Sequence, residues 1–423
     1  MEQSTIALIV LGVTLILFIS ERLPLVVTSI LGMLAMTFTG CCSYSEALSG
    51  FSNVAVIVIL GIDIITESFF VTGITDVMGN WFLKHENLTE KRFLILATTI
   101  ATLISSFLNG LIVITLFIPI INALSVKTEG KITKKNCYLP VAIGALLGGN
   151  LSVVGSSSMI TASTMMGESW VGHEMSFFGP SLVGLPGALV TIGLVALTGT
   201  KFQEKWFDFP ELENKHVEVL EHKDVTAPAW KRWVAIGVLA GLILAFILGG
   251  NFAAFALLGV CVLIITGCLT VEQAMKSVNV STFLLVGSIL GFAKGIDVSG
   301  AGQVIANKVV SWCGPLGESP WFMCVVMLFL ATLLSNVMFN NGTVVILVPI
   351  ALSFAQMFGA NPLAYVAAVG VGANLSVMTP ICTTTIAVTA SAGYRFKDYV
   401  RYGGLFNILS FVLTALVLGV YFI

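Results

Sequence analysis

The chain has 423 residues, of which 57% are hydrophobic and only 10% are charged, and its formal net charge is −2. Soluble domains carry about 25% charged residues, so this composition indicates an integral membrane protein. Apolar runs of spanning length occur along the whole chain, which excludes a single anchor on a soluble domain. The eight cysteines show no spacing typical of a disulfide framework or a zinc site.

The predicted elements are helices that cross the membrane. The first apolar run, IALIVLGVTLILFIS, lacks a basic leader region and a cleavage site, so we expect it to be a retained span. The predicted spans lie near residues 6–20, 24–40, 54–72, 137–166, 176–198, 233–249, 251–269, 281–297, 363–392 and 403–422. This pattern predicts an all-α polytopic membrane protein.

Two further apolar stretches, 93–125 and 321–358, contain polar interruptions. The first is broken by SSFLNG and the second by SNVMFNNGT, and each then carries a proline, Pro119 or Pro349. One continuous helix through either stretch would leave backbone donors unsatisfied in lipid. Each stretch is therefore predicted to be a re-entrant helix–turn–helix hairpin that is shielded by protein.

Basic residues predict the orientation of the chain. They gather between the predicted spans, at Lys84, Lys91, Arg92, Lys127, Lys131, Lys134, Lys135, Lys201, Lys205, Lys231, Arg232, Lys276, Arg395, Lys397 and Arg401. The positive-inside rule places these loops in the cytoplasm and both termini outside the cell membrane. The longest polar segment, 199–232, contains His216 and His222 and is predicted to be a cytoplasmic linker.

The sequence contains an internal repeat. The pattern LG-x6-TG at Leu31 returns 227 positions later at Leu258, and Gly73 and Gly300 keep the same offset. The first repeat is expected at 1–198 and the second at 233–423, each with five spans and one hairpin. An odd number of crossings inserts the second repeat upside down, and such inverted repeats with broken helices are typical of secondary transporters.

One predicted span in each repeat carries a polar interruption. GGNLSVVGSSS at 148–158 breaks the span 137–166, and GANLSVMTPICTTT at 372–385 breaks the span 363–392. The N-terminal amides of a broken helix suit an anion, and its free carbonyls suit a sodium ion. Small polar residues also occur where membrane helices merely pack closely. Because the two hairpin turns and the two breaks keep the register of the repeat, we favour a binding site.

Ionisable residues inside the predicted spans are scarce, and each is a functional hypothesis. Asp63 and Glu67 lie four residues apart on one helix face, and Glu67 corresponds to Lys294 under the repeat offset. These three residues could couple protons to transport or bind a carboxylate substrate. The alternative is a structural pair or side chains that reach the membrane interface.

The paired hairpins and breaks resemble the divalent anion:sodium symporter family of the wider ion-transporter superfamily. The resemblance rests on SSFLNGLIVITLFIPI with LGGNLSVVGSSS, and on SNVMFNNGTVVILVPI with ANLSVMTPICTTT and GYRFKDYVRYGG, and it covers about 45–410. It implies a homodimer whose transport domain moves against a scaffold in an elevator fashion. It also implies import of a dicarboxylate, citrate or sulfate with sodium.

The resemblance also implies the site residues. The substrate would contact Asn109, Ser156, Asn340, Asn341, Thr379 and Pro380. Two sodium sites would use Ser105, Asn109, Gly110, Gly155, Ser335, Met338, Asn340 and Met378. The family's Ser-Asn-Thr signature falls on Asn109, Gly110 and Leu111 in the first hairpin, and on Phe339, Asn340 and Asn341 in the second. Gly110, Leu111 and Phe339 depart from that signature. The departures at Gly110 and Leu111 leave undecided whether the first sodium site is intact.

The leading hypothesis is a sodium-coupled importer of a small divalent anion, with sodium as coupling ion, no other cofactor and no nucleic-acid partner. The first alternative is a proton-coupled carrier or exporter of the same superfamily. A passive anion channel is the second alternative, and hairpins with broken helices fit it less well than a gated site. No grouping typical of an enzyme occurs within the spans.

Overall fold

The computed structural model describes residues 2–20, 22–84, 89–169, 175–210, 228–248, 250–380 and 382–422. These residues form helices and connecting turns, with no strand among them. Seven helical stretches are long and apolar enough to cross a membrane: Tyr44–Val71, Gly110–Lys127, Ser181–Thr198, Ala229–Ile247, Val280–Val298, Asn340–Phe358 and Phe396–Phe422. The predicted all-α membrane protein is therefore confirmed.

The helices follow one another in the same order in both halves of the chain. The first half contains α1 (Gln3–Ser20), α2 (Leu25–Phe38), α3 (Tyr44–Ser49), α4 (Val54–Val71), α5 (Ile74–Lys84), α6 (Glu90–Ser105), α7 (Gly110–Lys127), α8 (Lys134–Gly148), α9 (Ser157–Ser169), α10 (Ser181–Thr198) and α11 (Lys201–Trp206). The second half contains α12 (Ala229–Ile247), α13 (Phe252–Ile265), α14 (Val271–Ser277), α15 (Val280–Val298), α16 (Ala301–Cys313), α17 (Pro320–Ser335), α18 (Asn340–Phe358), α19 (Pro362–Asn374), α20 (Thr384–Ala387), α21 (Phe396–Asp398) and α22 (Gly404–Leu418).

Both predicted hairpins are helix–turn–helix units. The first pairs α6 with α7 through a turn at 106–109, and the second pairs α17 with α18 through a turn at 336–339. Both predicted broken helices are also interrupted, because α8 and α19 end before a non-helical segment and α9 and α20 begin after it. The helices α5 and α16 were not predicted, because each is a polar-faced helix beside a span rather than a long apolar run.

Local structure recurs at the offset seen in the sequence. Gly40 and Gly267 both adopt a left-handed backbone, and so do Gly73 and Gly300. The helices α3 and α14 both begin with a capping box, formed by Ser43 with Glu46 and by Thr270 with Gln273. Matching sequence signals therefore end and begin helices at matching positions in the two halves. The opposite insertion of the two halves stays a prediction.

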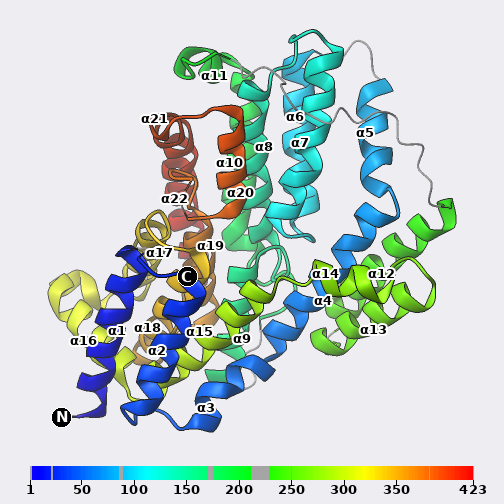
Figure 1. Ribbon diagram of the computed structural model, residues 1–423. Coiled ribbons are helices and arrows are strands. Elements are labelled where there is room, and N and C mark those ends of the chain that lie inside the picture. The colour runs from blue at the N-terminus through cyan, green and yellow to red at the C-terminus, as the bar shows by residue number, and fades with distance from the viewer. Residues whose placement is uncertain are drawn as a thin grey trace.

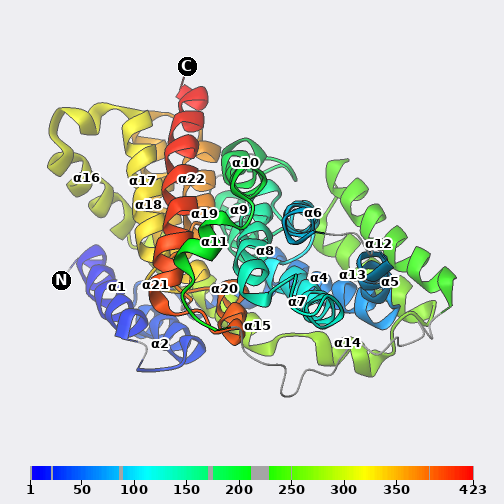
Figure 2. The same ribbon diagram turned by 90° about the horizontal axis from the view of Figure 1, so that it is seen from above.

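The two halves are interlocked rather than side by side. The helix α2 packs on α15 of the other half, and α13 packs on α4. Small residues allow these contacts, since Gly61 of α4 lies against Ala256 of α13. Figure 1 and Figure 2 show α1, α2 and α16 at one end of the molecule, α12 and α13 at the other, and the two hairpins on either side of a centre that contains α9 and α19.

The first part of the predicted linker 199–232 packs against the protein. Gln203 of α11 is buried and donates a hydrogen bond to the Tyr402 hydroxyl at 3.0 Å. Lys135 donates to the Phe209 carbonyl at 3.1 Å, which ties this segment to the start of α8. His216 and His222 lie outside the described residues, so the rest of the linker stays a prediction.

Candidate functional site

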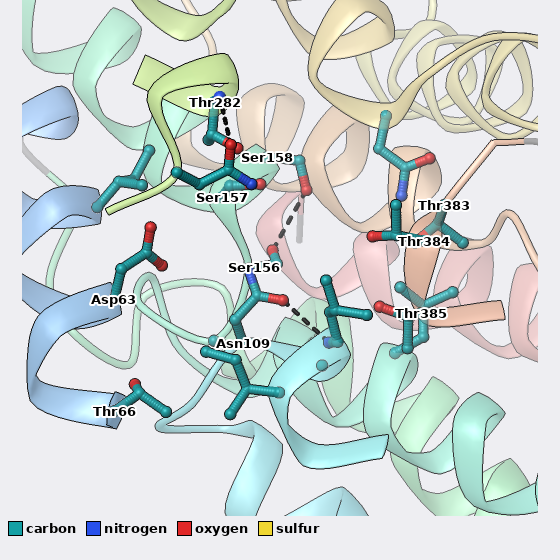
Figure 3. A pocket seen from close by; sticks show the side chains of 18 of the residues that line it. Asp63, Thr66, Asn109, Ser156, Ser157, Ser158, Thr282, Thr383, Thr384 and Thr385 are labelled. Carbon is teal, nitrogen blue, oxygen red and sulfur yellow. Dashed lines mark hydrogen bonds between the residues drawn. The ribbon is translucent and has the colours of Figure 1, made fainter. Parts of the chain in front are cut away.

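A cavity of about 310 Å³ lies where the two halves meet. Its wall is formed by α4, by the first turns of α7, α9, α15 and α18, and by the threonines at 383–385 beside α20. Figure 3 shows Asp63 on one side of the cavity, the three threonines on the other, and Asn109 and Ser156 between them. The volume is that of a small-molecule site.

Four long helices point their N-termini at this cavity. The lining includes Gly110 and Leu111 of α7, Ser157 and Ser158 of α9, Thr282 of α15, and Asn340 and Asn341 of α18. The first amides of a helix have no partner within the helix, and the helix dipole places a partial positive charge there. Converging N-termini therefore make this cavity attractive to an anion.

Side chains cap three of these four helices. Asn109 Oδ1 accepts from the Leu111 amide at 3.0 Å, Ser156 Oγ accepts from the Met159 amide at 3.2 Å, and Asn279 Oδ1 accepts from the Thr282 amide at 3.1 Å. The residue before α18 is Phe339, whose side chain makes no capping bond. None of the first-turn amides of α18 is therefore taken by a capping side chain, whereas each of the other three helices has one of its amides capped.

The charged side chains that line the cavity are both acidic. Asp63 and Glu67 lie one turn apart on α4, and the described lining contains no lysine, arginine or histidine. The backbone of Asn279, at the start of α15, lies beside the Asp63 carboxylate. Negative groups thus occupy the α4 side, whereas helix N-termini and neutral polar groups form the rest of the wall.

Asn374, at the end of α19, lines the cavity and joins the two halves. Its amide nitrogen donates to Asn150 Oδ1 at 2.6 Å and to Ser156 Oγ at 2.9 Å. Its amide oxygen accepts from Ser158 Oγ at 2.8 Å and from Asn340 Nδ2 at 3.2 Å. Asn150 and Asn374 are the matching residues of the two NLSV segments, so the centre of the site is a contact between equivalent positions.

The first hairpin turn is fastened to the first break by serine and glycine. Ser152 Oγ donates to the Ser106 carbonyl, and Ser105 Oγ donates to the Ala145 carbonyl of α8. A Cβ on Gly155 would lie 2.6 Å from both the Gly149 and Ser105 carbonyl oxygens. Only glycine fits at this position without moving the backbone.

The second hairpin turn is fastened to the second break by Asn336 and Thr379. Asn336 Nδ2 donates to the Leu375 carbonyl at 3.0 Å, and its Oδ1 accepts from the Met378 amide at 3.1 Å. Thr379 Oγ1 donates to the Asn336 carbonyl at 2.9 Å. These bonds satisfy backbone groups that the break would otherwise leave buried and unpaired.

The structure divides the sequence-predicted residues into two groups. Asn109, Gly110, Gly155, Ser156, Asn340, Asn341, Asp63 and Glu67 all line the cavity. The described lining does not include Ser105 and Ser335, which end α6 and α17, or Met338, Met378, Thr379 and Pro380, which lie in the second hairpin turn and the second break. Lys294 lies near the other end of α15, where it forms an ion pair with Asp297 at 3.9 Å. The roles predicted for all these residues stay predictions.

The start of α15 was missed as part of the wall. Ser277, Asn279 and Thr282 line the cavity, although they belong to neither a hairpin nor a break. The sequence gives one signal for them, because Asn279 ends VEQAMKSVN, the segment that matches SEALSGFSN in the first half. That signal predicts a helix start, but only the packing of α15 near α4 brings it to the cavity.

Comparison with protein families decides the broader identity. The family model described as a citrate transporter matches residues 15–370 and, in an overlapping match, 251–423. This chain belongs to the citrate transporter family. The match confirms the resemblance to the ion-transporter superfamily and places this chain among secondary transporters rather than enzymes.

Relatives of this citrate-transporter-family chain are distant. An uncharacterised transporter of Haemophilus influenzae is 22% identical over 95% of this chain and 88% of its own length. The transporter YfbS of Escherichia coli is 25% identical over 46% of this chain but only 31% of its own length, so the match spans about a third of that relative. Probable sodium/sulfate cotransporter 3 of Chlamydomonas reinhardtii is 24% identical over 51% of this chain and 25% of its own length.

Two solved structures share the fold. The YdaH transporter of Alcanivorax borkumensis aligns with a TM-score of 0.62 and 15% identity over 90% of this chain and 87% of its own. MtrF of Neisseria gonorrhoeae, described as one of a class of antimetabolite efflux pumps, aligns with a TM-score of 0.57 and 15% identity over 88% of this chain and 83% of its own. At this identity the likeness shows that this family member has a membrane-transporter fold.

Proposed function

We propose that this chain imports a small divalent anion, a dicarboxylate or a sulfate-like oxyanion, together with sodium. The observation that carries the proposal is the convergence of four helix N-termini on one cavity, of which the first turn of α18 has no capping side chain. An anion bound there accepts hydrogen bonds from backbone amides that have no other partner. The relatives named as sodium/sulfate cotransporters support this substrate class.

Sodium is the proposed coupling ion. Asn340 Oδ1 is buried and has no hydrogen-bond donor, which leaves it free to bind a cation. Asn340 also stands in the second of the two sodium sites that the family resemblance implies. A sodium ion beside the anion would offset its charge without a fixed basic residue in the membrane.

The wider arrangement is part of the same proposal. The recurrence of capping boxes and left-handed glycines supports an inverted repeat, with residues 1–198 and 233–423 inserted in opposite directions. We propose a homodimer in which the two hairpins and broken helices move as one transport domain. The termini then lie outside the cell and the basic loops in the cytoplasm.

A proton-coupled carrier or exporter is the second candidate. It is favoured by Asp63 and Glu67, since both carboxylates line the cavity. The fold shared with MtrF, an efflux pump by its description, fits this candidate as well. A passive anion channel is a weaker candidate, because the cavity is bounded by both hairpins rather than by an open pore.

Transport in proteoliposomes separates these candidates. Uptake of succinate, citrate and sulfate is measured under an inward sodium gradient and, separately, under an inward proton gradient. The proposal expects uptake driven by sodium, and it expects Asn340→Ala to weaken the sodium dependence while the protein still inserts. Uptake that ignores sodium and follows the proton gradient, with its pH dependence lost in Asp63→Asn, would establish the proton-coupled candidate. Conductance without saturable exchange would establish a channel.

A further inference from the structure

The cavity is chemically polarised between its two sides. Asp63 and Glu67 lie on α4, whereas the first turn of α18 and the threonines at 383–385 form other parts of the wall. Figure 3 shows the separation of Asp63 from Thr385 across the cavity. A ligand with negative charge alone would be attracted to one side and repelled by the other.

The threonine side of the cavity has unused hydrogen-bonding groups. Thr383 is 7% exposed and Thr385 is 3% exposed; both line the cavity, and their hydroxyls have no protein partner among the described residues. Buried polar groups are normally paired, so unpaired hydroxyls at a cavity wall indicate a ligand that pairs with them. Together with the uncapped first turn of α18, they make this side the anion end.

The α4 side needs a positive partner of a particular kind. Described residues contain no group of three histidine, cysteine, aspartate or glutamate side chains that could hold a metal ion. Asp63 and Glu67 alone fall short of the about six to eight oxygen ligands that a protein site offers Ca²⁺. An ammonium group fits better, because it has three donors and the two carboxylates are acceptors.

We propose that the substrate is an anion that also carries a protonated amine, such as an amino-dicarboxylate. Its amine binds Asp63 and Glu67, and its carboxylates bind the first turn of α18 and the threonines at 383–385. This inference rests on the proposed anion transport and specifies its substrate class. The cavity of about 310 Å³ accommodates a molecule of that size.

Matched pairs of ligands test the amine directly. Binding of glutarate and glutamate, and of succinate and aspartate, is measured on the purified full chain in sodium by thermal shift and by competition against one labelled anion. The members of each pair differ only in the amine, so their affinity ratio reports its contribution. We expect the amine-bearing member to bind about tenfold more tightly, as an added charge-assisted hydrogen bond would give.

Variants assign that preference to α4. In Asp63→Asn with Glu67→Gln the ratio is expected to fall close to one, while glutarate and succinate bind at least as well as before. Glu272→Gln is the matched control, because Glu272 is 77% exposed on α14 and pairs with Lys276 outside the cavity. This control is expected to keep the full ratio, and because the ratio is internal to each variant, a change in protein yield does not affect it.

Each outcome decides between the two proposals. Equal affinity within both pairs, or an unchanged ratio in the double variant, overturns the amine inference and leaves anion transport intact. A double variant that loses pH-dependent transport but keeps the ratio assigns the carboxylates to a proton and also overturns it. If no member of either pair binds or competes, the amine inference and the proposed dicarboxylate substrate fall together.

Discussion

The two hairpin–break units are built on the same plan but are closed by different side chains. In the first unit, Ser152 bonds to the carbonyl of Ser106, and Gly155 allows two backbones to touch. In the second unit, the side-chain amide of Asn336 bonds to the break through both its nitrogen and its oxygen. Thr379 occupies the position that matches Gly155. The first unit therefore depends on a serine hydroxyl and on the absence of a side chain at Gly155, whereas the second depends on the side chains of Asn336 and Thr379.

The difference extends to the helix that each unit presents to the cavity. Asn109 caps α7, whereas Phe339 leaves α18 uncapped. One first-turn amide of α7 is thus bonded to a side chain, whereas no first-turn amide of α18 is. We therefore expect the second unit to contribute more to ligand binding than the first.

The largest effect is expected for Gly155→Ala. Its Cβ would lie 2.6 Å from two carbonyl oxygens, and relieving that clash costs on the order of 3 kcal/mol of folding free energy. Thr379→Ala, at the matching position, loses the hydrogen bonds to the Asn336 carbonyl and to Cys382 Sγ, at a cost of about 1 kcal/mol. Melting temperature and monodisperse yield measure both, with Gly193→Ala as control because no atom lies within 4 Å of its Cβ position. Equal stability of the two variants would contradict the contrast between the units.

The next effect is expected for Asn374→Ala. This change removes four hydrogen bonds that hold both units together, so we expect transport to fall about tenfold or more and the melting temperature to drop. Asn150→Ala should cost less, because the Asn150 amide nitrogen is already unpaired. Initial uptake rates in proteoliposomes rank the variants. A larger loss in Asn150→Ala would show that the first unit, not Asn374, organises the centre.

A smaller effect is expected for Phe339→Asn, which gives α18 the capping residue that α7 has. The new cap should stabilise the ligand-free protein by about 1 kcal/mol and weaken anion binding about fivefold, because the cap and the anion compete for the same amides. Titration of the anion against thermal shift measures both. Phe339→Leu removes the ring without adding a cap, so an equal loss of affinity in this control would attribute the effect to the ring.

The smallest effect is expected for Lys294→Ala. Lys294 pairs with Asp297 at the far end of α15 and does not line the cavity, so uptake should stay within about twofold of the unchanged protein. The repeat offset places Lys294 opposite Glu67 in sequence, and Glu67 does line the cavity. A severe loss of uptake would show that the α15 ion pair takes part in transport.

Helix positions and interruptions were predictable because lipid imposes strict rules on the backbone. A polar turn before Pro119 or Pro349 cannot continue a helix in an apolar medium, so both hairpins follow from the sequence. The helices α5 and α16 were missed because their apolar faces are short and mixed with polar residues. Hydropathy detects length and apolarity, and these two helices have little of either.

The cavity wall was predictable only in part. The hairpin turns and breaks are recognisable in the sequence because Ser, Asn and Gly interrupt apolar runs. That contrast predicted the lining residues Asn109, Ser156, Asn340 and Asn341. The start of α15 and the central position of Asn374 depend on which helices pack together across the halves. That packing joins residues far apart in the sequence, so the hydrophobic periodicity within a single helix cannot predict it.

The packing of α2 and α13 on helices of the opposite half has a consequence for how the protein is made. The face of α2 that packs on α15, and the face of α4 that packs on α13, are synthesised long before their partners leave the ribosome. Until α13, which begins at Phe252, has been synthesised, the face of α4 around Gly61 lacks its partner. Biogenesis therefore includes a stage in which the first half is inserted but unfinished, and the two halves reach their final packing together.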